Sequence, residues 1–477
     1  MAESGPLPLR GLRATLLGAA IALAGCSVAM PKLEPPIPAQ WQHALAAQAA
    51  TPTDLRSWWR AFDDPTLNAL VDQALTRNLD VAQAVEHLRA ARVLQRHEGA
   101  RYLPSLNART EQTIDPDASA SYLVSGFDAT WEFGLFGRAE GTGREARGTL
   151  DASAADLQAA RVTLVAEVVR NWIELRTAQQ QEQLLQRINV VRGHQLDLLK
   201  VRQHLQLAPP GAVDQAQAAA AQAEAALAAP RQAINQAAQR LAVLLGQNHP
   251  DPAWLQPGPQ PRLGAWTLPG TPADLLRTRP EIARAEADVL RAAGELGVAH
   301  ADRFPKLGLG ASMIWATDLN NNKKHTVSNG LVSVGPLFDM PLFDWGLRAA
   351  AEHAKSHELK AAVLAYRQAV LQGVAEVETA LGTLQQQQQR EQHTQDAWQA
   401  LQRVDDTLQT RVRLKLESPL ALADGRLAAD QAAIELADAR ASRSLAYVTL
   451  FKALGGAPLP ADETPDAKSG KTTEASP

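Results

Sequence analysis

The sequence is an internal duplication, and this constrains the fold more than any other feature. Four short motifs of the first half return in the same order in the second half, at offsets of roughly 200 to 210 positions. Each half also has the same order of predicted elements: helix, strand pair, long helix, break, long helix. The matched motifs are Arg101-Tyr102-Leu103-Pro104 with Arg303-Phe304-Pro305, Leu135-Phe136-Gly137 with Leu342-Phe343-Asp344-Trp345-Gly346, Leu205-Gln206-Leu207-Ala208-Pro209 with Leu414-Lys415-Leu416-Glu417-Ser418-Pro419, and Leu244-Leu245-Gly246 with Ala453-Leu454-Gly455.

The long helices are predicted from a seven-residue repeat of apolar side chains. Ala, Gln, Leu, Arg and Glu are abundant and aromatic residues make up only 5%, a profile typical of helices that lean towards coiled coil. Such a repeat keeps one apolar stripe against a neighbouring helix. Pro209-Pro210-Gly211 and Ser418-Pro419 indicate tight turns between antiparallel helices, and Pro230 should kink its helix. The heptad positions include Leu150, Leu157 and Leu164, then Leu227, Ile234 and Leu241, and finally Leu427, Ile434 and Ala441.

The strand pairs are predicted from alternation of apolar and polar residues. The clearest strand runs from Tyr122 to Phe133, a second begins near Leu307, and segments 105–113 and 328–338 are weaker candidates. Segments 114–121 and 318–327 are polar enough to be loops in water. Strands of about 9–11 residues are long enough to cross a bilayer. The apolar positions of the two clear strands are Phe127, Ala129, Trp131 and Phe133, and Leu307, Leu309, Ala311, Met313 and Trp315.

Four strands cannot close a barrel, and an open sheet edge cannot lie in hydrocarbon. A membrane role for these strands therefore requires oligomerisation. The heptad helices make the same demand, because their apolar stripes need neighbouring helices.

The N-terminus is predicted to be a targeting segment. Arg10 and Arg13 precede an apolar run, Ala14 to Ala24, that is too short to span a bilayer comfortably. The run ends in Leu23-Ala24-Gly25-Cys26, which resembles the lipobox of bacterial lipoproteins, in which the cysteine becomes the acylated N-terminus. Cys26 is the only cysteine, so an internal disulfide is excluded. The resemblance also implies the outer membrane, because an Asp after the cysteine tends to retain such lipoproteins on the inner membrane and this chain has Ser27. The alternative is an ordinary signal peptide with an incidental cysteine.

These signals divide the chain into six segments. Residues 1–25 are the signal peptide, 26–55 a lipidated Pro- and Ala-rich tether, 56–247 the first repeat, 248–272 a Pro- and Gly-rich linker, 273–456 the second repeat and 457–477 a disordered tail. In this division the strand pairs lie at about 105–133 and 307–342.

Several functional classes are not supported. The formal net charge of −4 gives no reason to expect a nucleic-acid partner. No HExxH or related metal motif occurs, and His194 and His204 have no close carboxylate or cysteine spacing. No pairing of nucleophile and base suggests an enzyme, so neither a catalytic residue nor a cofactor or metal is expected.

The chain resembles the outer membrane efflux protein family, the channel-tunnel lipoproteins of tripartite pumps, from about Trp58 to Gly456. The resemblance implies a mainly α fold with a membrane β-barrel portion: a homotrimer with a twelve-stranded outer-membrane barrel and a long periplasmic α-helical barrel. It further implies a passive exit duct for small toxic compounds, with a periplasmic adaptor and an inner-membrane transporter as partners. The matching residues are Trp58-Trp59, Phe62-Asp63-Asp64-Pro65, Asn78-Leu79-Asp80, Trp131-Glu132-Phe133-Gly134-Leu135-Phe136-Gly137-Arg138, Arg279-Pro280-Glu281-Ile282 and Pro341-Leu342-Phe343-Asp344-Trp345-Gly346.

Two alternatives stay open: an outer-membrane duct for type I protein secretion, and a lipid-anchored periplasmic coiled-coil scaffold without a pore. The alternating face from Phe127 to Phe133 disfavours the scaffold. The sequence does not reveal the transported substrate.

The resemblance also implies a charged constriction near the helix turns. Asp424 falls where the family commonly has an acidic residue, and Asp214 is interpreted as its repeat equivalent. Three aspartates in a ring would attract cations. Ala421 stands where some members carry a second acid, which argues against two acidic layers. Arg411, Arg413 and Glu417 are further candidates for the gate, and the competing interpretation is that all five are solvated helix-end charges.

Overall fold

The computed structural model describes residues 28–34, 37–43, 53–113, 122–268, 271–318 and 331–459, and the chain is mostly helical, as predicted. The predicted signal peptide, Cys26, most of segments 114–121 and 318–327, and the tail from residue 460 lie outside the described residues. None of the helices within the described ranges combines the length and the apolarity needed to cross a membrane.

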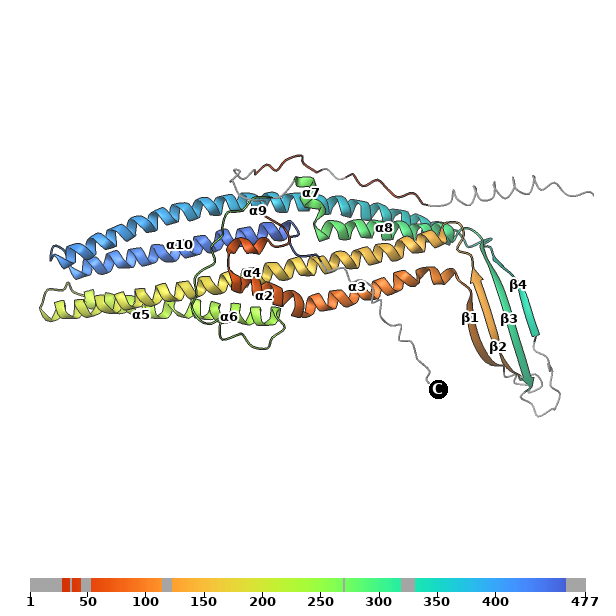
Figure 1. The fold of residues 1–477 in the computed structure, drawn as a ribbon, viewed down its shortest axis with the longest axis horizontal. Helices are drawn as coiled ribbons and strands as arrows, with labels where there is room; N and C mark the ends of the chain where they lie inside the picture. Colours follow the sequence, from red (N-terminus) through yellow and green to blue (C-terminus); the bar gives the residue numbers. More distant parts are fainter. Residues whose placement is uncertain are drawn as a thin grey trace, which may run out of the picture. The chain divides into compact units, whose positions relative to one another are not determined.

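The described elements follow the chain in the order shown in Figure 1. The first repeat contains the 3₁₀-helix η1 (Trp58–Phe62), α2 (Pro65–Arg77), α3 (Leu79–His97), the 3₁₀-helix η2 (Glu98–Tyr102), β1 (Ser105–Thr113), β2 (Tyr122–Glu132), α4 (Arg138–His204), α5 (Ala212–Ala226) and α6 (Ala228–Leu244). The second contains α7 (Pro272–Arg277), α8 (Pro280–Ala301), β3 (Lys306–Asp318), β4 (Leu331–Asp339), α9 (Leu347–Arg413) and α10 (Pro419–Ala453).

The chain forms two compact units, and each draws on both repeats. Unit 1 comprises Glu86–Ala155, Glu281–Val370 and the described residues before Ile37, and therefore contains the sheet. Unit 2 comprises the other described residues, including α5, α6, α10 and the distal parts of α4 and α9.

An aromatic cluster forms part of the core of unit 2. Trp58 is fully buried, stacks on Phe451 at 5.5 Å between ring centroids, and donates its indole N–H to the Gly456 carbonyl at 2.9 Å. The Tyr447 hydroxyl donates to the Trp58 carbonyl at 3.0 Å, so the polar ring atoms of Trp58 and Tyr447 both have partners. Asp64 caps α2 and accepts a hydrogen bond from Trp172 Nε1 at 2.7 Å. The Trp-Trp motif and Phe62 of the Phe-Asp-Asp-Pro motif are thus residues of the core.

The segment predicted as a linker is packed into unit 2. Trp254 and Trp266 are both buried, and the Trp254 carbonyl accepts a hydrogen bond from Gln179 Nε2 at 2.9 Å. Gln260 donates to the Ala437 carbonyl at 2.9 Å. Residues 248–268 therefore lie along α4 and α10.

The sheet of unit 1 has four antiparallel strands in the order β1-β2-β3-β4 (Figure 1). The registers are fixed by Ser105 opposite Thr130, Thr130 opposite Gly310, and Lys306 opposite Asp339. The weaker strand candidate at 105–113 coincides with β1. Within the sheet, the two repeats meet at β2 and β3, the central pair.

Two glycines allow α4 and α8 of unit 1 to approach closely. A Cβ at Gly294 would lie 2.5 Å from the Glu145 backbone nitrogen, and one at Gly148 would lie 2.6 Å from the Arg291 backbone nitrogen. Any larger residue would push the two backbones apart.

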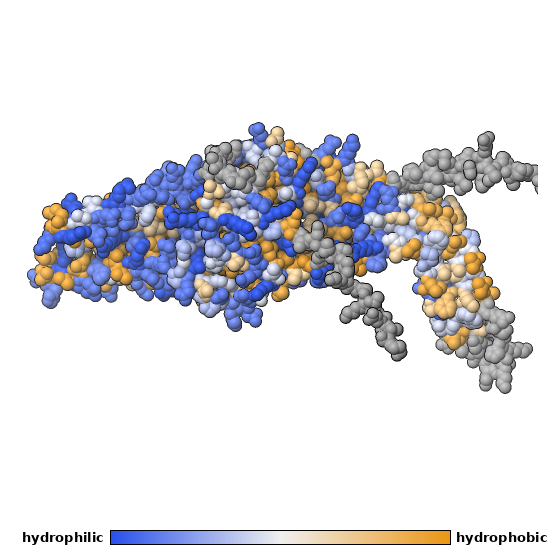
Figure 2. All heavy atoms as spheres, viewed as in Figure 1, coloured by the Kyte–Doolittle hydropathy of each residue, from blue (hydrophilic) through white to orange (hydrophobic). Residues whose placement is uncertain are grey.

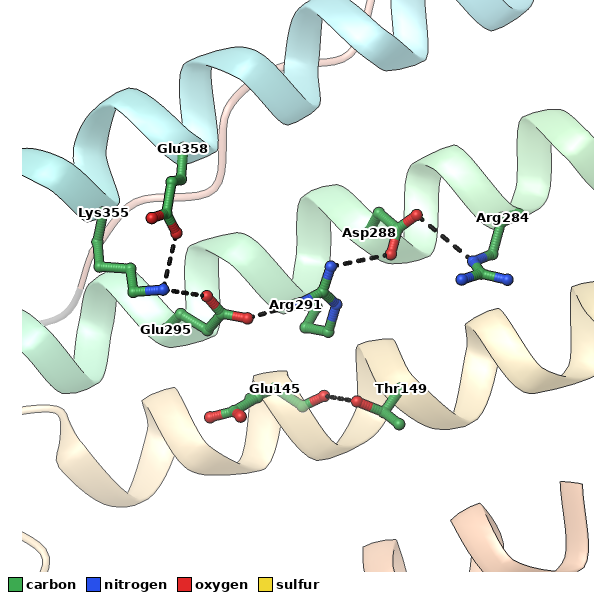
Figure 3. Close-up of polar contacts among 8 residues, drawn as sticks. All are labelled: Glu145, Thr149, Arg284, Asp288, Arg291, Glu295, Lys355 and Glu358. Carbon is green, nitrogen blue, oxygen red and sulfur yellow. Dashed lines mark hydrogen bonds and ion pairs between the residues drawn. The ribbon is translucent and has the colours of Figure 1, made fainter. Parts of the chain in front are cut away.

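A chain of ion pairs joins α8 to α9 in the same unit (Figure 3). Asp288 lies 3.3 Å and Glu295 2.7 Å from the Arg291 guanidinium, while Lys355 of α9 bonds both Glu295 and Glu358 at 2.7 Å. These two acceptors raise the pKa of Lys355.

The duplication is repeated in the backbone conformation. Four left-handed positions of the first repeat each have a left-handed counterpart 209 residues later: Phe136 and Trp345, Gly137 and Gly346, Gln206 and Lys415, Gly246 and Gly455. The structural counterpart of Phe136 is therefore Trp345 rather than Phe343. Each of these residues ends or begins a helix, where left-handed backbone reverses the chain.

The predicted break near Pro230 is present. The helix is interrupted at Leu227, between α5 and α6, three residues before the proline, which has no N–H to donate to the preceding turn. The counterpart helix α10 has Ala439 at the matching position and is continuous.

Candidate functional site

The sheet has one apolar and one polar face. Directly opposite residues share a face, and Phe127, Met313 and Val332 belong to the apolar one. The polar face is joined by hydroxyl contacts between Ser105 and Thr130 at 2.9 Å and between Ser312 and Ser333 at 3.0 Å. Apolar residues gather over the sheet in the view of Figure 2. Such a sheet can separate hydrocarbon from water.

Both outer strands of this sheet lack a second neighbour. The described ladders pair β1 only with β2 and β4 only with β3, so one row of backbone N–H and C=O groups is open on each side. Open edges of this length template pairing with another chain.

Large apolar residues are exposed where β4 leads into α9. Leu342 is 85% exposed, Phe343 75% and Trp345 91%, although their neighbours in sequence form ordered structure. In the first repeat, by contrast, Phe136 is stacked on Phe304 at 5.1 Å. The turn of the second repeat therefore presents an uncovered apolar surface.

The five predicted gate residues lie at the ends of α5, α9 and α10 in unit 2. Arg411 and Arg413 are in the last turn of α9 and Asp214 in the first turn of α5, where each complements the helix dipole. Arg411 lies 3.5 Å from Glu417, so the structure brings these two together. These contacts agree with ordinary helix-end charges.

Asp424 is placed differently, on the second turn of α10. Its Oδ1 accepts a hydrogen bond of 2.7 Å from Gln195 of α4, whose side chain is buried. Within the described residues no contact joins Asp424 to the other four gate candidates. Asp424 itself is exposed, so its carboxylate remains available to a neighbour or to solvent.

The 209-residue offset corrects the relation between the two aspartates. It makes Pro210 the counterpart of Pro419 and Gln215 the counterpart of Asp424, whereas Asp214 matches Ala423. The buried pairs Leu227 with Leu436 and Leu241 with Leu450 follow the same offset. In the alignment of the two repeats Asp214 is thus one position away from the residue that matches Asp424, and the two aspartates are not equivalent.

Further polar contacts tie α10 to α4 along its length. Arg187 of α4 lies 2.9 Å from Asp430 of α10, and Gln181 donates to Asp438. With the hydrogen bond between Gln195 and Asp424, three polar contacts therefore occur at intervals along these two antiparallel helices. α10 is therefore fastened to α4 by side-chain contacts as well as by apolar packing around Leu427.

The other side of α10 is linked to α9. Asp405 lies 3.8 Å from Arg426, and Glu391 lies 2.8 Å from Arg443 and 3.6 Å from Arg440. A cavity of 790 Å³ opens between α4, α9, α10 and residues 259–262, lined by Arg187, Asp405, Arg426 and Asp430 among others.

Burial raises the pKa of both acids in this cavity. For Asp430 burial outweighs the opposing effect of Arg187, and for Asp405 it outweighs that of Arg426. Both carboxyls therefore take up a proton more readily than a solvated aspartate.

Neither Asp430 nor Gln195 was identified from the sequence as a functional candidate. The heptad positions on α10 step through Ala423, Leu427, Asp430 and Ile434, so Asp430 occupies a position where an apolar residue is expected. A charge in a heptad position is the signal that could have revealed it. The structure also shows no cluster of three or more metal-binding side chains among the residues it describes.

Comparison with known proteins identifies the family. Its profile, described as outer membrane efflux protein, matches residues 70–247 and 271–456. The pyoverdine export outer membrane protein OpmQ of Pseudomonas aeruginosa is 30% identical over 93% of this chain and 96% of that protein. The outer membrane protein OprJ of the same species is 28% identical over 94% of this chain and 96% of its own.

Solved structures of the same type superpose on the chain. The outer-membrane channel OprN has a TM-score of 0.76 and 27% identity, covering 91% of this chain and 100% of that one. The open MtrE outer membrane channel of Neisseria gonorrhoeae has a TM-score of 0.76 at 24% identity, covering 90% of this chain and 98% of its own. With the profile matching both repeats, the chain belongs to the outer membrane efflux protein family.

Proposed function

We propose that three copies of this outer-membrane efflux protein join their sheets into one twelve-stranded β-barrel, and that the paired long helices form a periplasmic tunnel below it. The sheet carries this proposal, because it has one apolar face, one polar face and two open edges. Backbone groups at an open edge are too costly in hydrocarbon, so the sheet can be membrane-embedded only in a closed assembly. Twelve strands leave room for an aqueous channel, whereas eight are filled largely by side chains.

The proposed activity is passive export of small toxic compounds. An inner-membrane transporter and a periplasmic adaptor supply the solute, and the barrel releases it outside the cell. Support comes from relatives whose names describe export: a toluene efflux pump outer membrane protein of Pseudomonas putida is 26% identical over 92% of this chain. These names favour efflux over type I protein secretion.

The anchor and the gate complete the proposal. Residues 1–25 direct export, Cys26 carries the lipid, and the extended tether leads from it to the first repeat. Asp424, held by Gln195, lines the narrow end of the tunnel near the helix turns, with Asp214, Arg411, Arg413 and Glu417 around it. The exposure of Asp424 supports this placement.

Two measurements test the duct. Purified protein from outer membranes should migrate as a trimer that dissociates on heating, and it should conduct ions in planar bilayers. A deletion strain should become sensitive to a subset of drugs, solvents or metal ions in a broad toxicity screen. Protein that is monomeric and non-conducting would leave the lipid-anchored scaffold as the better description.

A further inference from the structure

We infer that β4 of one copy pairs with β1 of the next in the register that places Asp339 directly opposite Arg109 of the neighbouring copy. This inference rests on the proposed barrel and specifies its junction between copies, here called the β4–β1 junction. Its basis is the duplication: a contact that the first repeat makes with the second inside one chain should recur between the second repeat and the first repeat of another copy.

The duplication provides two offsets. The second strands and the helices after them are offset by 209 residues, as the left-handed pair Phe136 and Trp345 shows. The first strands are offset by 201, as Pro104 and Pro305 show. The two offsets can be checked against the sheet, because together they convert the observed pair Ser105 and Thr130 into Lys306 and Asp339. That pair is present in the β3–β4 ladder.

The observed β2–β3 ladder then gives the register of the β4–β1 junction. In that ladder Thr130 lies opposite Gly310. Moving Thr130 forward by 209 positions gives Asp339, and moving Gly310 back by 201 gives Arg109. Neighbouring pairs follow in the same way, with Phe338 opposite Thr110 and Met340 opposite Ala108.

The chemistry of the strands agrees with this register. Arg109 and Asp339 both lie on the polar face, and the Arg109 side chain is 65% exposed with Glu111 of its own strand as an ion-pair partner. Asp339 also faces Lys306 across the β3–β4 ladder, so the proposed row alternates cation, anion and cation.

Other registers are less favourable. A shift of one residue would turn Asp339 towards the apolar face of its neighbour, because facing alternates along a strand. A shift of two residues would set it opposite Glu111, a like charge, or opposite Asn107.

A second contact belongs to the same junction. Phe136 stacks on Phe304 with ring planes 14° apart, inside one chain. By the offsets of 209 and 201 residues the counterparts of Phe136 and Phe304 are Trp345 and Leu103, which are 91% and 60% exposed. The duplication therefore places Trp345 against Leu103 of the neighbouring copy, which removes the most exposed aromatic residue of the β4–α9 turn from water.

Cysteine cross-linking tests the register in the full chain. The variant carrying both Arg109→Cys and Asp339→Cys is oxidised in isolated outer membranes and run on non-reducing gels. Because a disulfide requires Cα atoms about 4.4–6.8 Å apart, covalent dimers and trimers should exceed those of two shifted pairs by roughly tenfold. The shifted pairs combine Asp339→Cys with Asn107→Cys or with Glu111→Cys. Each single variant and the native chain, whose only cysteine is Cys26, give the background.

Charge reversal provides a second readout if the cysteine variants do not assemble. Arg109→Glu and Asp339→Arg should each lower the temperature at which the trimer dissociates. The double variant should lose less than the sum of the two single losses, because the swapped pair attracts although Glu111 and Lys306 then face like charges. Stronger cross-linking of a shifted pair, or additive losses in the double variant, would overturn the register while leaving the barrel intact. Absence of any heat-sensitive oligomer in the native protein would instead reject the barrel itself.

Discussion

At the scale of single residues, the polar groups along α10 show what sequence can identify. Asp424 was predicted because it matches a family position, and the structure adds a partner, Gln195, on another helix. Asp430 was missed because contact between α4 and α10 is not visible in either sequence segment alone. A heptad pattern predicts which residues face a neighbour, but it does not say which neighbour carries Arg187.

Replacing Asp424 by Ala should increase single-channel conductance and antibiotic leakage if its carboxylate restricts the tunnel. Asp424→Asn removes the charge but keeps an oxygen that accepts the hydrogen bond from Gln195. This variant therefore separates the effect of the charge from that of the hydrogen bond, and a loss of cation selectivity at normal conductance indicates a ring of charge. Asp80→Ala serves as the control at an exposed helix-end acid outside the proposed gate. Unchanged conductance and selectivity in Asp424→Ala would contradict the gating role.

Asp430→Asn should alter how stability depends on pH. Because burial raises the pKa of Asp430, the folded protein binds this proton more tightly than the unfolded chain does. The contribution of Asp430 to native stability therefore grows as the pH falls through its raised pKa towards the ordinary pKa of 3.8. The same contribution is lost as the pH rises through the raised pKa. The melting temperature of the native protein minus that of Asp430→Asn should thus grow on acidification from pH 7 to about 4. Asp214→Asn is the control, and a difference that shrinks on acidification would refute the assignment.

At the scale of elements, helices and strands were predictable because their periods differ. The alternation of apolar and polar residues identified the strands, and the heptad repeat identified the long helices. Pro230 indicated the break between α5 and α6. The close crossing of α4 and α8 was not predicted. Gly148 and Gly294 occur in different repeats, and isolated glycines in helices have no sequence pattern that pairs them.

Gly294→Ala should destabilise unit 1. The new Cβ would meet the Glu145 backbone 2.5 Å away, and overpacking of this kind costs about 1–3 kcal/mol. Gly143→Ala in α4 is the matched control, because a Cβ there has no atom within 4 Å in the described chain and Ala favours a helix by about 1 kcal/mol. Thermal melts of the detergent-solubilised protein should show opposite shifts for the two variants, and equal shifts would contradict the close crossing.

At the scale of the whole molecule, the duplication was visible in the sequence but its alignment was not. The sequence motif suggested Phe343 as the counterpart of Phe136, whereas the left-handed backbone at both Phe136 and Trp345 identifies Trp345 as the counterpart. Short motifs tolerate small shifts, but backbone conformation at a turn does not. The open edges of the sheet predict assembly from the chain itself, and membership of the family then gives that assembly its biological setting.

Cys26→Ser tests how the proposed lipid and the proposed barrel share the anchoring. A closed barrel is embedded by its whole apolar surface and holds a chain in the membrane far more firmly than acyl chains on one residue do. An exported variant with a cleavable signal peptide in place of residues 1–25 should therefore remain in outer membranes and retain at least part of its efflux. The fraction of this variant found in outer membranes and the drug susceptibility of cells that produce it test these two expectations. Complete release into the periplasm would show that the lipid alone anchors the chain.

The order β1-β2-β3-β4 has a consequence for the kinetics of assembly. The β2–β3 contact joins two repeats that are already covalently linked, so its effective concentration is fixed by the chain and dilution does not change it. Contacts between copies must form by collision. Refolding should thus show a fast step independent of protein concentration, in which the half-sheets of one chain meet, followed by a step whose rate falls on dilution. In the proposed trimer, three of the six contacts between a second strand pair and a first strand pair would thus form within one chain, as a consequence of the duplication.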